Sequence, residues 1–346
     1  MKWIILNPFS HNTNVRWIPE HINDENIEFK VVPADYSHDR SRENSSSKQW
    51  LDFLRHALRA WFSVGGKRKE PQGFITCFPQ LPLILGCLKR ITFSKRVILA
   101  WTFNLGRTYG GVKGKVAKFG FAAVDKFIVH SREEIEIYSS WLNIPQNRFE
   151  FVPLAVLTTN IEQAVLEEKC SNTTEPYVVA LGTANRDYPT LIEAMKNTGY
   201  RTVIVSGQSA VANIKLPENI EVKSGLSLKA CHQLALNSTV NVVPIKNRNA
   251  PSGQVTFIEA MMMGKATVVT NCSGSKDYIK NGHDGLLVPV GSVQELELAI
   301  RTLWENTKVR SSIERNAKEK AFKDFRLQSV APLMKKILLE LMQTRL

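Results

Sequence analysis

Short apolar runs alternate with helical patterns along the whole chain, and this alternation constrains the fold more than any other feature. Strands that alternate with helices form parallel sheets covered by helices, and buried parallel strands are continuously apolar. The sequence therefore predicts an α/β protein. The predicted strands span residues 3–6, 29–32, 73–77, 97–101 and 127–129 in the first half, and 177–181, 202–205, 220–222, 240–243, 266–269 and 286–288 in the second.

The length of the chain predicts two domains. Its 346 residues exceed what one hydrophobic core usually serves, so two cores of about 150 to 180 residues each are expected. We place the first domain at residues 1–155 and a linker at residues 156–175. The second domain then covers residues 176–330, and residues 331–346 form a helix that packs back on the first domain.

Composition narrows the class of protein. With 43% hydrophobic and 22% charged residues, the chain has enough apolar surface for sizeable cores. The sequence has no run of about 20 apolar residues that would predict a membrane-spanning helix, and no signal-peptide pattern follows Met1. A cytoplasmic location is therefore expected. The five cysteines are scattered and lack the spacing of metal ligands, which predicts reduced thiols and no metal site.

The segment from residue 250 to residue 289 contains the residues that most clearly predict a binding site. Ser252, Gly253 and Gln254 stand where an apolar helix begins, and Thr256 falls in its first turn. A helix N-terminus attracts anions through unsatisfied N–H groups and its dipole, so a diphosphate is expected there. Glu259 lies more than one turn further on, where its carboxylate can accept hydrogen bonds from a ribose or sugar diol.

After this helix come Gly264-Lys265, a β-branched strand and a glycine-rich loop, and the whole run resembles the donor-binding signature of group-one (family four) GT-B glycosyltransferases. The family's usual form has two glutamates separated by seven residues, of which Glu259 matches the second. Pro251 stands where the first would fall. A subset of the family with Ser-Gly-Gln at this place is similar, which assigns part of the missing role to Ser252 and Gln254.

The resemblance implies two Rossmann-like domains that face each other across a cleft. It implies transfer of a sugar from a nucleotide-diphosphate donor, such as a UDP-sugar, to a glycan or lipid-linked acceptor in polysaccharide or glycoconjugate assembly. Retention of the anomeric configuration and independence of metals are implied as well. The nucleotide-sugar is a substrate, so no cofactor is expected.

Further donor contacts are expected in the loops that follow the strands of the second half. Gly182 ends the first of these strands, and Arg186 precedes a helix that starts near Asp187. In the family this turn carries cations that hold the diphosphate, and an arginine fork matches phosphate oxygens, so Arg186 is predicted to bind the donor and to support catalysis. Thr183 replaces the family's usual arginine. The remaining predicted contacts are a second cation, Lys246 or Arg248, and the nucleotide-side residues Gly207, Lys223 and Gly225.

Acceptor contacts are harder to predict, because the acceptor-binding first half of such enzymes varies with the substrate. The loop after the first strand offers His11 and Arg16, and the loop after residue 101 offers Asn104 and Arg107. Asn104 is a candidate catalytic residue that positions a hydroxyl, because an amide cannot act as a general base. Asp125 is expected to be a helix-end or turn residue, and it is also the best-placed catalytic carboxylate if the reaction inverts. His130 is expected to be structural.

The net charge of the chain bears on the kind of partner that it binds. The chain carries +13 overall, and the first 155 residues hold 22 Lys and Arg against 14 Asp and Glu. Basic residues gather beside the apolar helices 81–93 and 116–121, which suits either docking on an anionic membrane or a solvated basic face. Two other functions remain open, namely a glycosyltransferase that modifies nucleic acid and a GT-B binding module without catalysis. A sugar-nucleotide epimerase of related fold is a third, weaker alternative.

Overall fold

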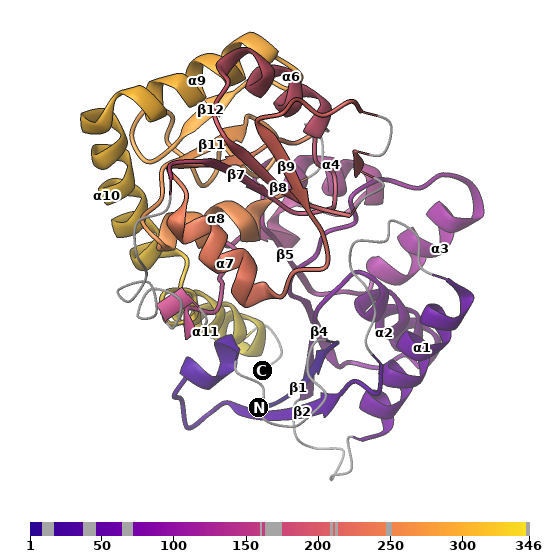
Figure 1. The fold of residues 1–346 in the computed structure, drawn as a ribbon. Helices are drawn as coiled ribbons and strands as arrows, with labels where there is room; N and C mark the ends of the chain where they lie inside the picture. The colour runs from indigo at the N-terminus through magenta and orange to yellow at the C-terminus, as the bar shows by residue number, and fades with distance from the viewer. Residues whose placement is uncertain are drawn as a thin grey trace. The chain divides into compact units, whose positions relative to one another are not determined.

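The computed structural model describes residues 1–8, 17–36, 46–63, 72–159, 161–162, 175–207, 210–211, 214–246 and 251–343. The chain forms two compact units, one of residues Met1–Pro153 with Leu327–Leu346 and one of residues Leu154–Arg326. Each unit contains a six-stranded sheet with helices around it (Figure 1). All strand pairs are parallel, so the predicted α/β class is confirmed.

The sheet of the first unit has the strand order β2-β1-β3-β4-β5-β6. Its strands are β1 (Lys2–Asn7), β2 (Glu28–Pro33), β3 (Gln72–Thr76), β4 (Val97–Ala100), β5 (Lys126–Val129) and β6 (Phe149–Phe151). Its helices are η1 (Ile18–His21), α1 (Ser47–Phe62), α2 (Gln80–Ile91), α3 (Gly111–Phe121), α4 (Glu133–Leu142), η2 (Gln146–Arg148) and α11 (Leu327–Gln343).

Local sequence explains several of these elements. A capping box starts α1, because Ser46 Oγ accepts from Gln49 N at 3.3 Å and Gln49 Oε1 accepts from Ser46 N at 2.7 Å. α2 and α3 approach closely where Gly86 meets Gly120, since a Cβ on Gly86 would lie 2.1 Å from the Gly120 carbonyl oxygen. The last helix, α11, belongs to this unit, where Lys335 Nζ pairs with Asp24 Oδ2 at 2.9 Å.

The sheet of the second unit has the order β12-β11-β10-β7-β8-β9. Counted from β7, this is the Rossmann order 3-2-1-4-5-6, in which ligands bind at the carboxyl ends of the strands where the order reverses. That point lies between β7 and β10. The strands are β7 (Val178–Leu181), β8 (Thr202–Val205), β9 (Ile220–Lys223), β10 (Val240–Val243), β11 (Thr267–Thr270) and β12 (Leu286–Val288). The helices are α6 (Tyr188–Thr198), α7 (Leu228–Asn237), α8 (Gln254–Met262), α9 (Val293–Glu305) and α10 (Thr307–Asp324).

Candidate functional site

The N-terminus of α8 lies next to the point where the strand order of the second sheet reverses. Gly253 is the N-cap residue with φ at +75°, and as a glycine it brings no side chain of its own to cap this end of the helix. A side chain at position 253 would be excluded, because its Cβ would lie 2.7 Å from Val243 Cγ1. The first intrahelical bond runs from Phe257 N to Gly253 O at 3.1 Å, so the preceding amides of the turn point along the helix axis. This is the geometry of an anion site.

Arg186 crosses from the β7–α6 loop to this helix end. Its Nε donates to Leu181 O at 3.1 Å, Nη1 donates to Ala184 O at 2.8 Å, and Nη2 donates to Thr256 Oγ1 at 3.1 Å. The side chain is nearly buried, and burial lowers the pKa of the guanidinium from its usual range. Three of its five N–H groups are therefore engaged, and two make no hydrogen bond to the described part of the chain.

Gly182 makes room for this arginine. Its φ is +119°, and a Cβ there would lie 2.6 Å from Arg186 Nη2, so only glycine permits the observed position of the guanidinium. The hydroxyl of Tyr188, which is fully buried, donates to the Gly182 carbonyl and fixes the same turn. Burial raises the pKa of this phenol to about 12, so it remains a donor at neutral pH.

The loops after β7 and β10 are joined to each other. Asn185 Nδ2 donates to Ser252 Oγ at 3.0 Å, and Lys246 N donates to Asn185 O at 3.2 Å. Gln254 is buried, with Nε2 3.0 Å from where a Cβ of Gly274 would lie, so its side chain reaches the glycine-rich loop. The structure thus brings together most of the predicted phosphate-side residues, namely Gly182, Arg186, Lys246, Ser252, Gly253, Gln254 and Thr256.

Glu259 lies one turn below Thr256 on α8 and contacts a histidine that the sequence analysis did not single out. His232 Nε2, on α7, is 3.3 Å from Glu259 Oε2. The imidazole is 2% exposed, and neither ring nitrogen has hydrogen-bond geometry to any described residue. The predicted diol-binding carboxylate therefore lies against a buried histidine ring.

The predicted nucleotide-side residues follow β8 and β9 along the same edge of the sheet. Gly207 lies just beyond β8, Lys223 ends β9, and Gly225 has φ at +69° in the exposed turn that follows. Lys223 Nζ pairs with Glu221 Oε1 at 2.5 Å and lines a cavity of about 540 Å³ beside α7. These residues lie one and two strands away from Arg186, which follows β7.

In the first unit, the described acceptor candidates lie in the loop after β4. The Oδ1 atom of Asn104 accepts from Gly106 N at 2.9 Å, and Arg107 lies over the Tyr109 ring, 5.2 Å from its centroid. The loop is anchored by Phe103, whose N donates to Ile128 O at 2.9 Å. His11 and Arg16 lie outside the described residues, as does Arg248.

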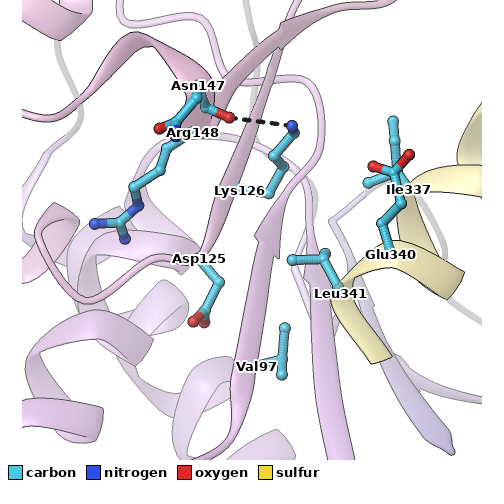
Figure 2. Close-up of a pocket in the computed structure, with 8 residues that line it drawn as sticks. All are labelled: Val97, Asp125, Lys126, Asn147, Arg148, Ile337, Glu340 and Leu341. Carbon is cyan, nitrogen blue, oxygen red and sulfur yellow. Dashed lines mark hydrogen bonds between the residues drawn. The ribbon is translucent and has the colours of Figure 1, made fainter. Parts of the chain in front are cut away.

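Asp125 lies at the opposite edge of the sheet from Asn104, which favours the turn role predicted for it over the catalytic one. Asp125 directly precedes β5, and its Oδ2 accepts from Ile98 N at 2.8 Å and pairs with Lys89 Nζ at 2.6 Å. These contacts hold it at the amino ends of the strands, whereas Asn104 follows the carboxyl end of β4. Figure 2 shows Asp125 with Lys126, Arg148 and Glu340 around a pocket of about 400 Å³ at this amino-terminal edge.

His130, at the carboxyl end of β5, has a structural role as expected. Its Nδ1 is 2.7 Å from Val152 O and therefore donates to this carbonyl. Complete burial lowers the pKa of the ring to about 4, and the hydrogen bond to Val152 opposes this only in part. The ring is therefore neutral at pH 7.

Two features are absent from the described residues. No group of three or more His, Cys, Asp and Glu side chains in the described ranges is arranged to hold a metal ion. Across the same part of the chain, no helix combines the length and the apolar character that crossing a bilayer requires.

Comparison with known proteins identifies similar sequences and folds. The family described as "Glycosyl transferases group 1" matches residues 164–320. Among curated proteins, N,N'-diacetylbacillosaminyl-diphospho-undecaprenol alpha-1,3-N-acetylgalactosaminyltransferase of Campylobacter jejuni is 33% identical over 89 residues. That alignment covers 26% of this chain and 23% of the relative, so the chain matches less than a quarter of that protein's length.

The similarity to solved structures extends over nearly the whole chain. Sucrose-phosphate synthase from Thermosynechococcus elongatus superposes with a TM-score of 0.73 over 99% of this chain and 100% of its own, at 14% identity. Anabaena HepE, solved in complex with UDP-glucose, gives a TM-score of 0.66 over 98% of this chain and 100% of its own, also at 14% identity. At this level of identity the superpositions establish the fold, which is GT-B.

Proposed function

We propose, on the premise that residues 164–320 belong to the group 1 glycosyl transferases, that the chain is a hexosyltransferase that uses a nucleoside-diphosphate sugar. One observation carries this proposal: Arg186 and the uncapped N-terminus of α8 meet at the reversal point of a Rossmann-order sheet. HepE, which shares the fold, was solved with UDP-glucose, and this supports a UDP-sugar as the donor.

In the proposed reaction the departing diphosphate is stabilised electrostatically. The amides of the first turn of α8 and the two remaining N–H groups of Arg186 take up the charge that develops as the glycosidic bond breaks. Lys246 is exposed at the end of β10 and supplies the second cation. These groups carry out the neutralisation that a metal ion performs elsewhere, so the transfer is proposed to be metal-independent.

The acceptor is proposed to be a glycan or a lipid-linked sugar. The Campylobacter relative is named for a diphospho-undecaprenol acceptor, which supports the second of these. Asp125 is engaged by Lys89 and the Ile98 amide at the amino-terminal edge, which supports retention by a front-side route over an inverting reaction with Asp125 as the base. In that route the leaving phosphate accepts the proton of the acceptor hydroxyl, and Asn104 positions the hydroxyl.

A nucleotide panel tests the donor site. We expect UDP to raise the unfolding midpoint more than GDP, ADP or CMP. A ligand that binds only the folded state stabilises it by about 2.7 kcal/mol at 100 times its Kd. In calorimetry UDP should bind at least about tenfold more tightly than UMP, because the second phosphate reaches the helix end. Chelation with EDTA should change neither result.

The outcome decides between enzyme and binding module. Equal affinity for UDP and UMP would contradict a diphosphate site at α8. Tight UDP binding without hydrolysis or transfer of UDP-sugars would favour a GT-B module that has lost catalysis. Binding that disappears with EDTA would contradict metal independence.

His232 provides a second test of the same site. We expect His232→Leu to raise the KM for the donor about tenfold, because the Glu259 carboxylate loses the polar ring that lies 3.3 Å from it. Its stability should stay equal or rise, because two buried nitrogens without hydrogen bonds to described residues are removed. His232→Gln, which keeps an N–H donor, should retain most of the affinity. A parallel loss of stability and affinity in both variants would indicate a packing role only.

A further inference from the structure

The first unit carries an exposed apolar and basic area on α2 and α3, which we call the α2–α3 surface. Large apolar side chains stand out into solvent there: Phe93 is 91% exposed, Val112 is 78% exposed and Ile91 is 67% exposed. Contiguous exposed apolar groups of this kind mark interaction sites in soluble proteins. The surface consists of the apolar residues Ile91, Phe93, Val112, Val116 and Phe119 and the cations Arg90, Lys95, Lys113, Lys115 and Lys118.

On α3 the apolar residues form one stripe. Val112, Val116 and Phe119 are spaced by four and three residues, so they lie on the same side of the helix. Lys113 and Lys115 flank the stripe on its two sides, and both are exposed. The solvent-facing side of α3 therefore combines an apolar stripe with flanking lysines. The opposite side of the helix packs inward through Gly114, Ala117 and Phe121.

The end of α2 continues this stripe. Arg90 lies over the Phe119 ring, 4.4 Å from its centroid, and its Nη1 donates to Phe119 O at 3.3 Å. Figure 1 shows α2 and α3 side by side, and the contact of Gly86 with Gly120 allows the two helices to pack closely. Phe93 follows with φ at +51°, a conformation that is uncommon for an aromatic residue and that holds its ring in solvent.

The charge of this region has one sign. Residues 71–124 contain eight Lys and Arg and no Asp or Glu. Three of the eight are engaged by the fold, because Lys89 pairs with Asp125 at 2.6 Å, Arg96 donates to Trp61 O at 2.9 Å and Arg90 donates to Phe119 O at 3.3 Å. Four lysines form no ion pair or hydrogen bond with the described residues, namely Lys95, Lys113, Lys115 and Lys118.

We propose that the α2–α3 surface docks the protein on an anionic phospholipid bilayer. The cations meet the lipid headgroups, and Phe93, Ile91 and the α3 stripe enter the boundary with the acyl chains. The exposed aliphatic side chains favour a bilayer over a nucleic acid, because a phosphate backbone offers them no apolar partner. The inference deepens the proposed function, since a lipid-linked acceptor is found at such a bilayer, but docking itself does not depend on catalysis.

Vesicle sedimentation tests the electrostatic part with a matched pair of variants. The full chain should bind phosphatidylcholine vesicles only when they contain phosphatidylglycerol. Lys113→Ser with Lys115→Ser should lower the partition coefficient about 25-fold, since each lysine near an anionic surface contributes about fivefold. Lys215→Ser with Lys308→Ser removes the same charge from exposed positions of the second unit and should change it less than about twofold.

A second pair tests the apolar part. Phe93→Ser should lower the partition coefficient about tenfold, because an exposed ring that enters the bilayer is lost. Leu298→Ser removes a side chain that is 60% exposed on α9 and should have no effect. Circular dichroism and the unfolding midpoint should be unchanged in all four variants, because each altered side chain is exposed.

Three outcomes would overturn the inference. The first is equal binding to vesicles with and without phosphatidylglycerol, and the second is equal losses in the test and control variants. The third is a loss of binding to an oligonucleotide, but not to vesicles, in the lysine variant, which would make the surface a nucleic-acid contact. UDP binding in solution should be intact in every variant, so failure of docking and failure of the donor site are separate results.

Discussion

An Arg186→Ala protein is expected to unfold about 3 kcal/mol more easily than the parent and to lose measurable binding of UDP. The guanidinium donates to two backbone carbonyls and to the Thr256 hydroxyl from a nearly buried position. Hydrogen bonds from a charged group are worth about 1.5 to 3 kcal/mol each, and the release of a buried charge offsets part of their loss. Urea unfolding measures the first effect, and calorimetry at a temperature where the variant is folded measures the second.

Arg201→Ala is the matched control for this change. Arg201 belongs to the same unit, but its side chain is 47% exposed and its Nη2 lies 3.8 Å from Glu221 Oε2. An exposed pair of this kind contributes less than about 1 kcal/mol, so both stability and UDP binding should remain near the parent values. An Arg186→Ala protein that keeps its stability and its UDP affinity would remove Arg186 from both the turn and the donor site.

Replacement of Glu259 by glutamine is expected to lower kcat/KM for the nucleotide-sugar about 100-fold. The change keeps the shape of the side chain but removes the charge that strengthens hydrogen bonds from a diol. Two such bonds, each weakened by about 1.4 kcal/mol, give this factor. Initial rates at several donor concentrations measure it, and Glu295→Gln, an exposed residue on α9, controls for the change in net charge.

A deoxynucleotide identifies the diol. If Glu259 binds the ribose, the parent should prefer UDP over 2′-deoxy-UDP, and Glu259→Gln should bind both equally. If it binds the donor sugar, the preference for the ribonucleotide should persist in the variant, while the affinity for UDP-sugar falls to that for UDP. An unchanged kcat/KM in Glu259→Gln would exclude both assignments.

The central strands of both sheets were predictable because buried parallel strands are continuous apolar runs. Residues 202–205 and 240–243 were placed with the bounds that the structure has, since both are fully buried. The start of α6 was equally predictable, because Asp187 is its N-cap and accepts from Thr190 N at 3.4 Å. Such signals are local, so one segment of sequence suffices to show them.

What the sequence did not reveal depends on contacts between distant segments. His232 stands in an ordinary amphipathic helix, and only the packing of α7 near α8 places it at Glu259. Asn185 likewise gains its role from Ser252, 67 residues away. The two roles predicted for Asp125 stayed open for the same reason, because only its contacts with Lys89 and the Ile98 amide show that it lies at the amino-terminal edge of the sheet.

The link from Arg186 to Thr256 also sets when the site can form during folding. The two residues are 70 positions apart, and β10 must pair beside β7 before the loops that carry them can meet. Contacts of such sequence separation require closure of a long loop, so they are late and slow compared with helix formation. A chain released from the ribosome before α8 has emerged contains no complete anion site. Fluorescent UDP added during refolding would therefore report the completion of this unit rather than its early collapse.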